Sequence, residues 1–184
     1  MKMAIINKSK HTGFTLIEMI VTVSIAAILA SIAIPSFTTM IKNNRLTAST
    51  NELVSALILA RSEALKRSQN VSVCASTNQT SCSGTNFATG WIVFVDCSSP
   101  PNGVLDATVD CNGDGDTTDA DDKDTIVKVH GPIAGMSISK TGNTGYQAYN
   151  FAGRSAVSTF TVTPTSGSGS KQISISLTGR LQTN

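Results

Sequence analysis

Residues 13–37 read GFTLIEMIVTVSIAAILASIAIPSF, and this stretch decides how the rest of the chain is organised. Between Phe14 and Ile34 it contains 21 residues, of which Glu18 is the only charged one. As a helix, such a segment is long enough to cross the roughly 30 Å hydrocarbon layer of a membrane. Lysines at positions 2, 8 and 10 precede it. We therefore expect the N-terminus to face the cytoplasm and the remainder of the chain to lie on the other side.

Glu18 is unusual in this setting, because a carboxylate in hydrocarbon is costly and needs a partner. Length and charge alone leave two interpretations open. In the first, Glu18 has a functional role. In the second, the segment is an ordinary signal anchor and the Glu18 side chain reaches toward the membrane interface.

The hexapeptide G-F-T-L-I-E, at the end of a short basic leader, resembles the class III signal of type IV pilins and type II secretion pseudopilins. This resemblance implies that a prepilin peptidase cuts between Gly13 and Phe14 and methylates the new N-terminus at Phe14. It also implies that Glu18 meets the terminal amine of a neighbouring subunit, so that two opposite charges neutralise each other during packing. Pro35 matches the helix-kinking proline of that family.

The chain is thus expected to comprise a leader (1–13), a membrane-spanning stem helix (14–36) and an exported head (37–184). Helical periodicity continues beyond Pro35, where apolar residues recur three, four and seven positions apart: Leu46, Leu53, Leu57, Ala60 and Ala64. No glycine occurs between Phe14 and Gln69. We predict one helix, kinked at Pro35, that runs to about Ser68.

After the helix, short β-branched or aromatic segments alternate with Gly, Pro and Ser, which predicts strands. The expected strands are 71–75, 90–95, 125–130, 147–151, 158–163 and 172–177. None of the connections has helical periodicity, so the strands are expected to pair mainly antiparallel. The predicted fold class is α+β, with the long helix packed on a β head.

Three segments resemble the GspH/FimT group of minor pilins and pseudopilins: LVSALILARSEALK (53–66), GWIVFVD (90–96) and FAGR (151–154). The resemblance implies two antiparallel sheets against the helix. It also implies a structural subunit that starts in the inner membrane and ends at or near a filament tip, with a role in initiating assembly. Three functions stay open: a type IV minor pilin, a type II secretion pseudopilin of the same build, or a tip protein that binds DNA for natural transformation.

Charge and residue content bear on these alternatives. Lys and Arg number 14 against 12 Asp and Glu, so no strong overall field for nucleic acid follows. The acids concentrate between Asp96 and Asp124, and none follows Asp124. The chain contains two histidines, His11 and His130, and offers no nucleophile–histidine–acid set. We therefore expect no enzymatic activity.

Four cysteines, Cys74, Cys82, Cys97 and Cys111, all follow the membrane segment. An even number in an exported domain predicts two disulfides, for which three connectivities are possible. We favour Cys74–Cys82 and Cys97–Cys111, because each closes a short loop rich in Gly, Ser and Asn. A zinc site is the alternative, which the absence of a Cys-x-x-Cys pair disfavours.

The acidic stretch that begins at Asp110 fits the calcium-loop pattern D-x-N-x-D-G-x5-D. Its ligand positions are Asp110, Asn112, Asp114, Asp116 and Asp121, and Gly115 occupies the sharp turn. Short Asp and Asn side chains supply the hard oxygens that Ca²⁺ prefers. The twelfth position is Asp rather than Glu, however, and no helices are predicted to flank the loop. A solvated acidic turn between two strands is the alternative.

The C-terminal Gly179-Arg180 partly matches a Gly-Arg-x-Arg element of DNA-binding FimT-type proteins, with Gln182 in place of the second arginine. Phosphate binding strengthens with each neutralising cation. Arg154 and Lys171 are candidates to add to Arg180 if the three share a face. The alternative is that Arg180 is a solvated residue near the chain end.

Overall fold

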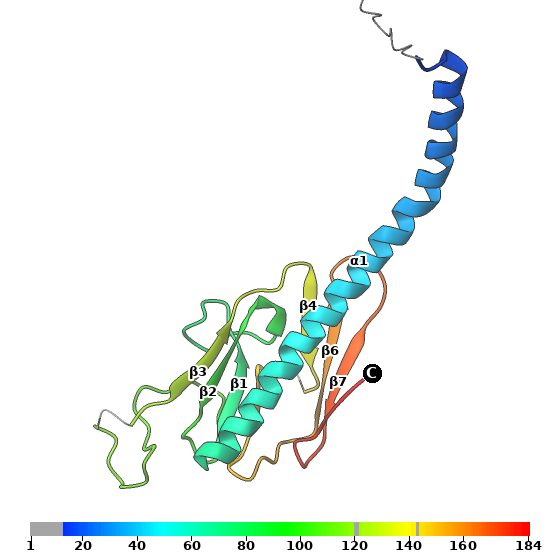
Figure 1. Ribbon diagram of the computed structural model, residues 1–184. Coiled ribbons are helices and arrows are strands. Elements are labelled where there is room, and N and C mark those ends of the chain that lie inside the picture. Colours follow the sequence, from blue (N-terminus) through cyan, green and yellow to red (C-terminus); the bar gives the residue numbers. More distant parts are fainter. Residues whose placement is uncertain (1–12, 120–121, 143) are drawn as a thin grey trace, which may run out of the picture. The chain divides into compact units, whose positions relative to one another are not determined.

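The computed structural model describes residues 13–119, 122–142 and 144–184, and it has the α+β fold that was predicted (Figure 1). The described residues form a long helix, a short 3-10 helix and eight strands. In chain order these are α1 (Leu16–Arg67), β1 (Val71–Ala75), η1 (Phe87–Thr89), β2 (Trp91–Val95), β3 (Thr125–His130), β4 (Met136–Lys140), β5 (Tyr146–Tyr149), β6 (Ser158–Pro164), β7 (Lys171–Ile175) and β8 (Leu181–Thr183). The leader residues before position 13 lie outside the described part.

The chain divides into two compact units between Ile41 and Lys42. In the first unit, every described residue is exposed. Among the described residues, α1 is the one helix that is long and apolar enough to cross a membrane, by length and composition. Pro35 lies inside α1, and the hydroxyls of Thr38 and Thr39 donate to its carbonyl oxygen at 2.9 and 3.1 Å. The kink at Pro35 stays a prediction.

Both ends of α1 carry recognisable capping signals. At the N-terminus, the Thr15 hydroxyl accepts the N–H of Glu18 at 3.3 Å, as in a Thr-x-x-Glu capping box. At the C-terminus, Lys66 and Arg67 occupy the last turn, and Ser68 adopts a left-handed φ of 55°. The predicted end near Ser68 is therefore confirmed.

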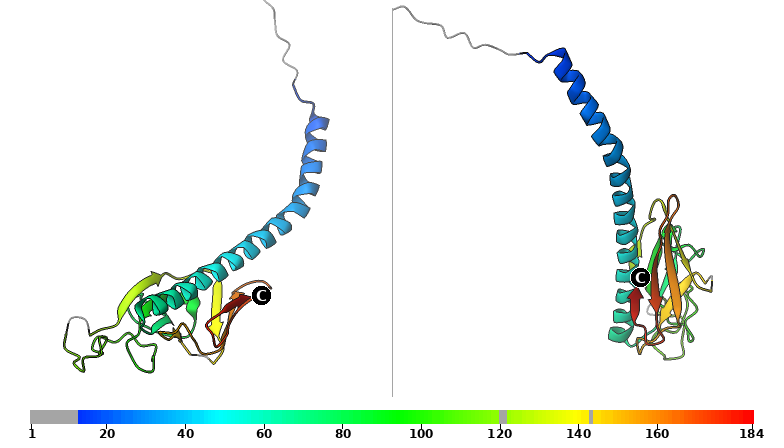
Figure 2. Two further views of the ribbon diagram at one scale, coloured as in Figure 1. Left: turned by 60° about the horizontal axis from the view of Figure 1, so that its bottom comes forward. Right: turned by 90° about the vertical axis from the view of Figure 1, so that its right-hand side faces the viewer.

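In the second unit, α1 lies along one side of two four-stranded sheets (Figure 2). Its buried stripe includes Leu53, Leu57, Ala60 and Ala64, which recur at three- and four-residue spacing. These side chains join a core with apolar residues from both sheets. The alanines leave room for the sheets to approach the helix closely.

The first sheet has the order β3-β2-β1-β5, and all its pairs are antiparallel. Every residue of β1 and β2 is buried, because this sheet is covered on both faces. One face joins the main core. On the other, Cys74, Ile92 and Phe94 form a second small core with Leu105 and Tyr146. Coverage on both sides explains the continuous apolar run of β2.

The second sheet has the order β4-β6-β7-β8, also antiparallel throughout. Its strands alternate in burial: Phe160, Val162, Ile173 and Ile175 are buried in the main core. Two of these strands, β4 and β8, are absent from the predicted set. β8 has three residues and is paired only with β7, so no local pattern marks it.

Candidate assembly segment and binding surfaces

The assembly segment predicted from sequence lies in open, non-helical backbone followed by the first helical turn. Gly13, Phe14 and Thr15 precede the helix, and Phe14 is 80% exposed. Extended, exposed backbone is what a peptidase needs to reach a peptide bond. Glu18 is exposed in the first turn, where the helix dipole favours a negative charge. Among the described residues, it forms no ion pair within the chain.

Two turns with similar sequences, FAGR at 151–154 and LTGR at 177–180, lie against each other in the head. An added Cβ on Gly179, whose φ is +73°, would lie 2.1 Å from the carbonyl oxygen of Gly153. The N–H of Ser155 donates to the carbonyl of Leu177 at 3.3 Å. The backbones therefore meet so closely that only glycine fits at position 179.

Arg61 of α1 connects both turns to the helix by hydrogen bonds. Its Nε donates to the carbonyl of Gly153 at 3.2 Å and its guanidinium nitrogen donates to the carbonyl of Thr178 at 3.1 Å. A guanidinium offers several donors in a fixed geometry, which suits it to bridging two carbonyls. Sequence reasoning does not identify this role, although the position of Arg61 next to the buried Ala60 hints that its side chain lies near the core boundary.

The basic residues predicted to act together are only partly brought together. Arg154 and Arg180 follow the two touching glycines, and both are exposed. Lys171 lies elsewhere: it pairs with Val162 at one end of β7, whereas Ile175 at the other end precedes the LTGR turn. Lys171 and Ile175 are four residue steps apart along the strand, which corresponds to about 13 Å. Lys171 therefore lies at a distance from Arg154 and Arg180 rather than beside them.

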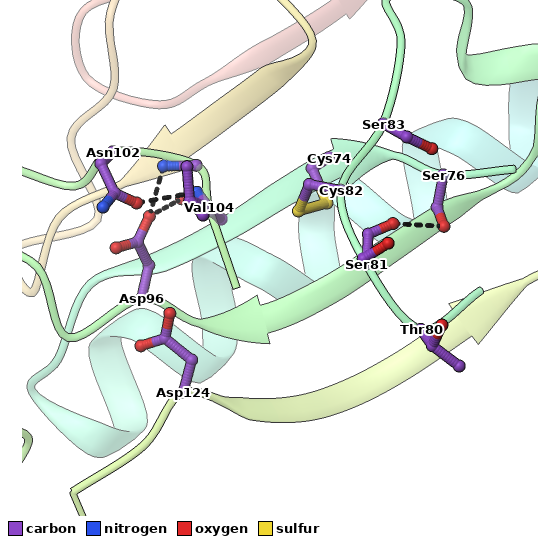
Figure 3. The surroundings of a disulfide bond; sticks show 12 residues. Cys74, Ser76, Thr80, Ser81, Cys82, Ser83, Asp96, Asn102, Val104 and Asp124 are labelled. Carbon is purple, nitrogen blue, oxygen red and sulfur yellow. Dashed lines mark hydrogen bonds between the residues drawn. A yellow bond between two sulfur atoms is a disulfide. The ribbon is translucent and has the colours of Figure 1, made fainter. Parts of the chain in front are cut away.

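Both favoured disulfides are present: Cys74 bonds to Cys82, and Cys97 bonds to Cys111. Cys74 lies on β1 with its side chain in the small second core, and Cys82 packs against that core (Figure 3). The second bond links Cys97, the first residue of the acidic insert (97–124), to Cys111 within the insert. The zinc alternative is thereby excluded for these cysteines, because their sulfurs are bonded to each other.

Two buried aspartates, one just before the acidic insert and one at its end, hold the ends of the insert to the sheet. Asp96 accepts the Ser72 hydroxyl at 2.7 Å and the Gly103 N–H at 2.9 Å. Asp124 accepts the N–H groups of Cys97 at 2.9 Å and Asp106 at 2.8 Å. Figure 3 shows the two carboxylates on neighbouring segments. The two carboxylates thus anchor the insert by accepting three backbone N–H groups and one hydroxyl, and neither forms an ion pair among the described residues.

Burial raises the pKa of Asp124 above its ordinary value, and the negative charges of Asp96 and Asp106 act in the same direction. The two backbone hydrogen bonds act in the opposite direction and do not outweigh burial. Keeping the Asp124 carboxylate ionised near neutral pH therefore costs folding free energy.

The side chains of the predicted calcium ligands accept hydrogen bonds from backbone N–H groups of their own loop. Asp110 accepts the N–H of Gly113 at 2.5 Å and that of Gly115 at 3.1 Å. Asn112 accepts the Asp114 N–H, and Asp114 accepts the Asp116 N–H. In the described part of the chain, the one group of potential ligands within 4.8 Å of one another is Cys97, Cys111 and Asp124. The carboxylates of Asp110, Asp114 and Asp116 are therefore not gathered, and Asp121 lies outside the described residues.

Comparisons with known proteins agree with the architecture. A family model described as type II transport protein GspH matches residues 49–179, and a model of the prokaryotic N-terminal methylation motif matches residues 8–34. No curated protein sequence matches the chain.

Solved structures with a similar fold include two crystal forms of the type IV minor pilin FimU of Pseudomonas aeruginosa, both 19% identical in sequence. The P21 form has a TM-score of 0.54 and covers 78% of this chain and 90% of FimU. The P65 form has a TM-score of 0.52 and covers 76% and 92%. The minor pseudopilin EpsH from the type 2 secretion system of Vibrio cholerae is 12% identical, with a TM-score of 0.45, and covers 76% of this chain and 96% of that one.

Proposed function

Since the chain belongs to the family of the type II transport protein GspH, we propose that it assembles through its N-terminal helix into a type IV pilus as a minor pilin. At the coarser level, it is a minor pilin or pseudopilin, a structural subunit of a type IV pilus or a type II secretion system and not an enzyme. The proposal adds the choice of the pilus, a position at the tip and a role in starting filament growth.

The observation that carries the assembly step of this proposal is the exposure of the first unit. Every described residue from Gly13 to Ile41 is exposed, and large apolar side chains point outward all along it, with Leu16 78% and Ile32 70% exposed. Such a surface is stable only inside a membrane or against other apolar helices. A subunit stored in the inner membrane and then packed into a helical bundle meets both conditions.

The proposed life of the protein begins as a single-pass inner-membrane precursor with its head in the periplasm. A prepilin peptidase removes residues 1–13 and methylates Phe14, which leaves Glu18 as the fifth residue. In the filament, Glu18 then pairs with the terminal amine of a neighbouring pilin. The absence of an intrachain ion pair for Glu18 among the described residues supports this role, because the carboxylate is available to another subunit.

Replacing Glu18 by Ala tests the assembly role directly. We expect normal processing but a several-fold lower amount of the protein in sheared filaments, measured by immunoblot against the total cell content. Glu52→Ala is the matched control, because it removes a half-exposed carboxylate from the same helix but in the head. Wild-type levels of the Glu18 variant in the filament fraction would rule out the pairing role.

A deletion strain separates the pilus from the secretion system. Loss of surface filaments with normal protein secretion supports the minor pilin. Normal filaments with secreted proteins retained in the periplasm would instead support the pseudopilin.

DNA binding is a second candidate, which the adjacency of Arg154 and Arg180 favours. Two cations on touching turns add to phosphate affinity, although they lack Lys171. A gel-shift of the full chain in detergent with duplex DNA, across a range of salt concentrations, tests it. Unchanged mobility at low salt, or equal shifts for Arg154→Ala, Arg180→Ala and the control Lys128→Ala, would rule against this candidate.

A further inference from the structure

The outer edge of β3 is open. β3 is the end strand of the order β3-β2-β1-β5, and it pairs with β2 alone (Figure 1). Among the described residues, no group outside β2 forms a hydrogen bond with the backbone of β3. The side of β3 that faces away from β2 therefore presents free N–H and C=O groups along a strand of six residues.

The other strands that end a sheet are shorter, and two of them are covered. Tyr149 of β5 bridges to Ser155. In the second sheet, the N–H of Ile138 in β4 donates to the Asn86 side chain at 2.9 Å. β8, at the other end of that sheet, has three residues. β3 thus offers the longest open edge in the described part of the head.

One face of β3 carries exposed apolar side chains. Ile126 lies opposite Phe94 and Val129 lies opposite Ile92. Residues that are paired across two strands share a face, so Ile126 and Val129 lie on the side of the small second core. They are 39% and 37% exposed, whereas Phe94 and Ile92 are fully buried. Apolar side chains of an added strand would extend this core over Ile126 and Val129.

The opposite face of β3 carries positive charge. Lys128 lies opposite Val93 of the main core, is exposed, and forms no ion pair among the described residues. His130, on the same face, already lies 3.6 Å from the Glu52 carboxylate. A lysine in the middle of an edge strand disfavours a purely apolar or basic partner strand and favours an acidic residue beside it. β3 contains no acidic residue, so the β3 of a second copy does not supply this charge.

Both ends of β3 are held in place. Directly before the strand, Asp124 accepts the N–H groups of Cys97 and Asp106. At the other end, the His130 ring stacks on Trp91, with 3.9 Å between ring centroids and 7° between ring planes. A strand edge that is already fixed loses less conformational entropy when it binds a peptide.

We propose that β3 binds an extended segment of another filament subunit, which adds as a strand to the open edge. Its apolar side chains cover Ile126 and Val129, and an acidic side chain pairs with Lys128. Backbone hydrogen bonds provide affinity in this mode of recognition, and the alternating side chains provide specificity. The identity of the partner as a filament subunit rests on the proposed function, whereas the chemistry of the edge does not.

The edge itself is tested with a defined peptide and the full chain in detergent. The probe is a fluorescent eight-residue peptide that alternates Glu and Val, and binding is followed by anisotropy. We expect saturable binding, at least tenfold weaker for the same peptide with methylated backbone amides and for an alternating Lys–Val peptide. Equal binding of the methylated peptide would mean that backbone hydrogen bonds do not contribute, and strand addition would be wrong.

A reversal of charge locates the binding. Lys128→Glu is expected to weaken binding of the Glu–Val peptide at least tenfold and to strengthen binding of the Lys–Val peptide at least tenfold. The control Lys171→Glu changes a partly exposed lysine on β7, in the other sheet, and should bind both peptides like wild type. Melting curves check that each variant is folded, and the comparison of peptides on the wild type needs no variant. An unchanged preference in Lys128→Glu, or equal changes in both variants, would overturn the proposal.

A photo-crosslinking residue tests the partner in cells. Thr125 is exposed at the start of β3, so benzoylphenylalanine at this position should crosslink to an acidic and apolar segment of another filament protein, identified by mass spectrometry. The same residue at Gln172, which is exposed on β7, is the control and should not reach that segment. A crosslink only to a second copy, the same segment from both positions, or no crosslink would overturn the assignment of the partner. If the protein were absent from filaments while the peptide still bound, the proposed function would fail and the chemistry of the edge would stand.

Discussion

At the scale of single residues, the contact between the two Gly-Arg turns makes Gly179 a tightly constrained position of the head. Gly179→Ala adds a methyl group 2.1 Å from the Gly153 carbonyl at a φ of +73°. We expect a loss of at least ~2 kcal/mol in the free energy of unfolding, measured by urea denaturation. Gly113→Ala is the control, because φ is +81° there but nothing lies within 4 Å. It should cost about 1 kcal/mol, and equal losses would contradict the close contact.

Asp124 gives the head a pH dependence of defined sign. Its folded-state pKa is raised above the ordinary 3.8, so the folded state binds the proton more tightly than the unfolded state. The stability due to this group is present below that ordinary value and is lost as pH rises through the raised pKa. Relative to Asp124→Asn, the wild type should therefore lose stability as pH increases from about 4 toward neutral.

Asp116→Asn supplies a control of opposite sign. The hydrogen bond from the Thr118 hydroxyl, and then those from the Thr117 and Thr118 N–H groups, lower the pKa of Asp116. The wild type should gain stability relative to this variant as pH rises through the lowered pKa toward 3.8. Urea denaturation between about pH 3 and 7 measures both series. Parallel curves for wild type and Asp124→Asn would show that Asp124 is not perturbed.

Sequence reasoning identified residues whose role follows from local spacing, such as the paired cysteines. It did not find Arg61, Asp96 or Asp124 as anchors. Each of these side chains has a hydrogen-bond partner far along the chain, for example Arg61 to the carbonyl of Gly153 and Asp96 to the hydroxyl of Ser72, and no spacing within the sequence marks such a pair.

At the scale of elements, the predicted helix and the strongest strands agree with the structure, because periodicity and β-branched runs are local properties. β3 matches its predicted bounds at 125–130. β4 was missed although its residues alternate in burial, since MSISK is short and largely polar. The burial of both faces of β1 and β2 could not be predicted, because the covering residue Leu105 lies in the insert.

The disulfide between Cys97 and Cys111 is expected to protect the insert as an element. It closes a 14-residue separation, so replacing both cysteines by Ala should cost about 3 kcal/mol by loss of the constraint on the unfolded chain. Lys123 is the one tryptic site between Arg67 and Lys128, and it lies between the buried Asp122 and Asp124. Trypsin should cut at Lys123 faster in this variant. A Cys74→Ala/Cys82→Ala variant with the same rate at Lys123 would contradict a local role.

The calcium loop stays a prediction that thermal melting can test. Bringing the separated carboxylates of Asp110, Asp114 and Asp116 together around one ion would remove their mutual repulsion. If the loop binds calcium, added Ca²⁺ should raise the melting temperature of the wild type by several degrees and leave Asp114→Asn/Asp116→Asn unchanged. Identical melts of the wild type in EDTA and in calcium would exclude the site.

At the scale of the whole molecule, processing at Gly13 is expected to decide whether the chain leaves the membrane. An added Cβ at Gly13 meets nothing within 4 Å, so Gly13→Leu should leave the fold intact. We expect the variant to accumulate as a precursor that is 13 residues longer and to be absent from filaments, as measured by immunoblot. A mature band of normal size would refute the cleavage position, and Ser9→Leu, inside the leader, is the control.

The two disulfides also bear on how the protein is made. Each bridge joins cysteines that are consecutive in the chain, 74 with 82 and 97 with 111. As the polypeptide emerges into an oxidising compartment, the second cysteine of each pair appears when its correct partner is the one cysteine that still has a free thiol. Biogenesis should therefore require a thiol oxidase but no isomerase to unscramble mispaired bonds.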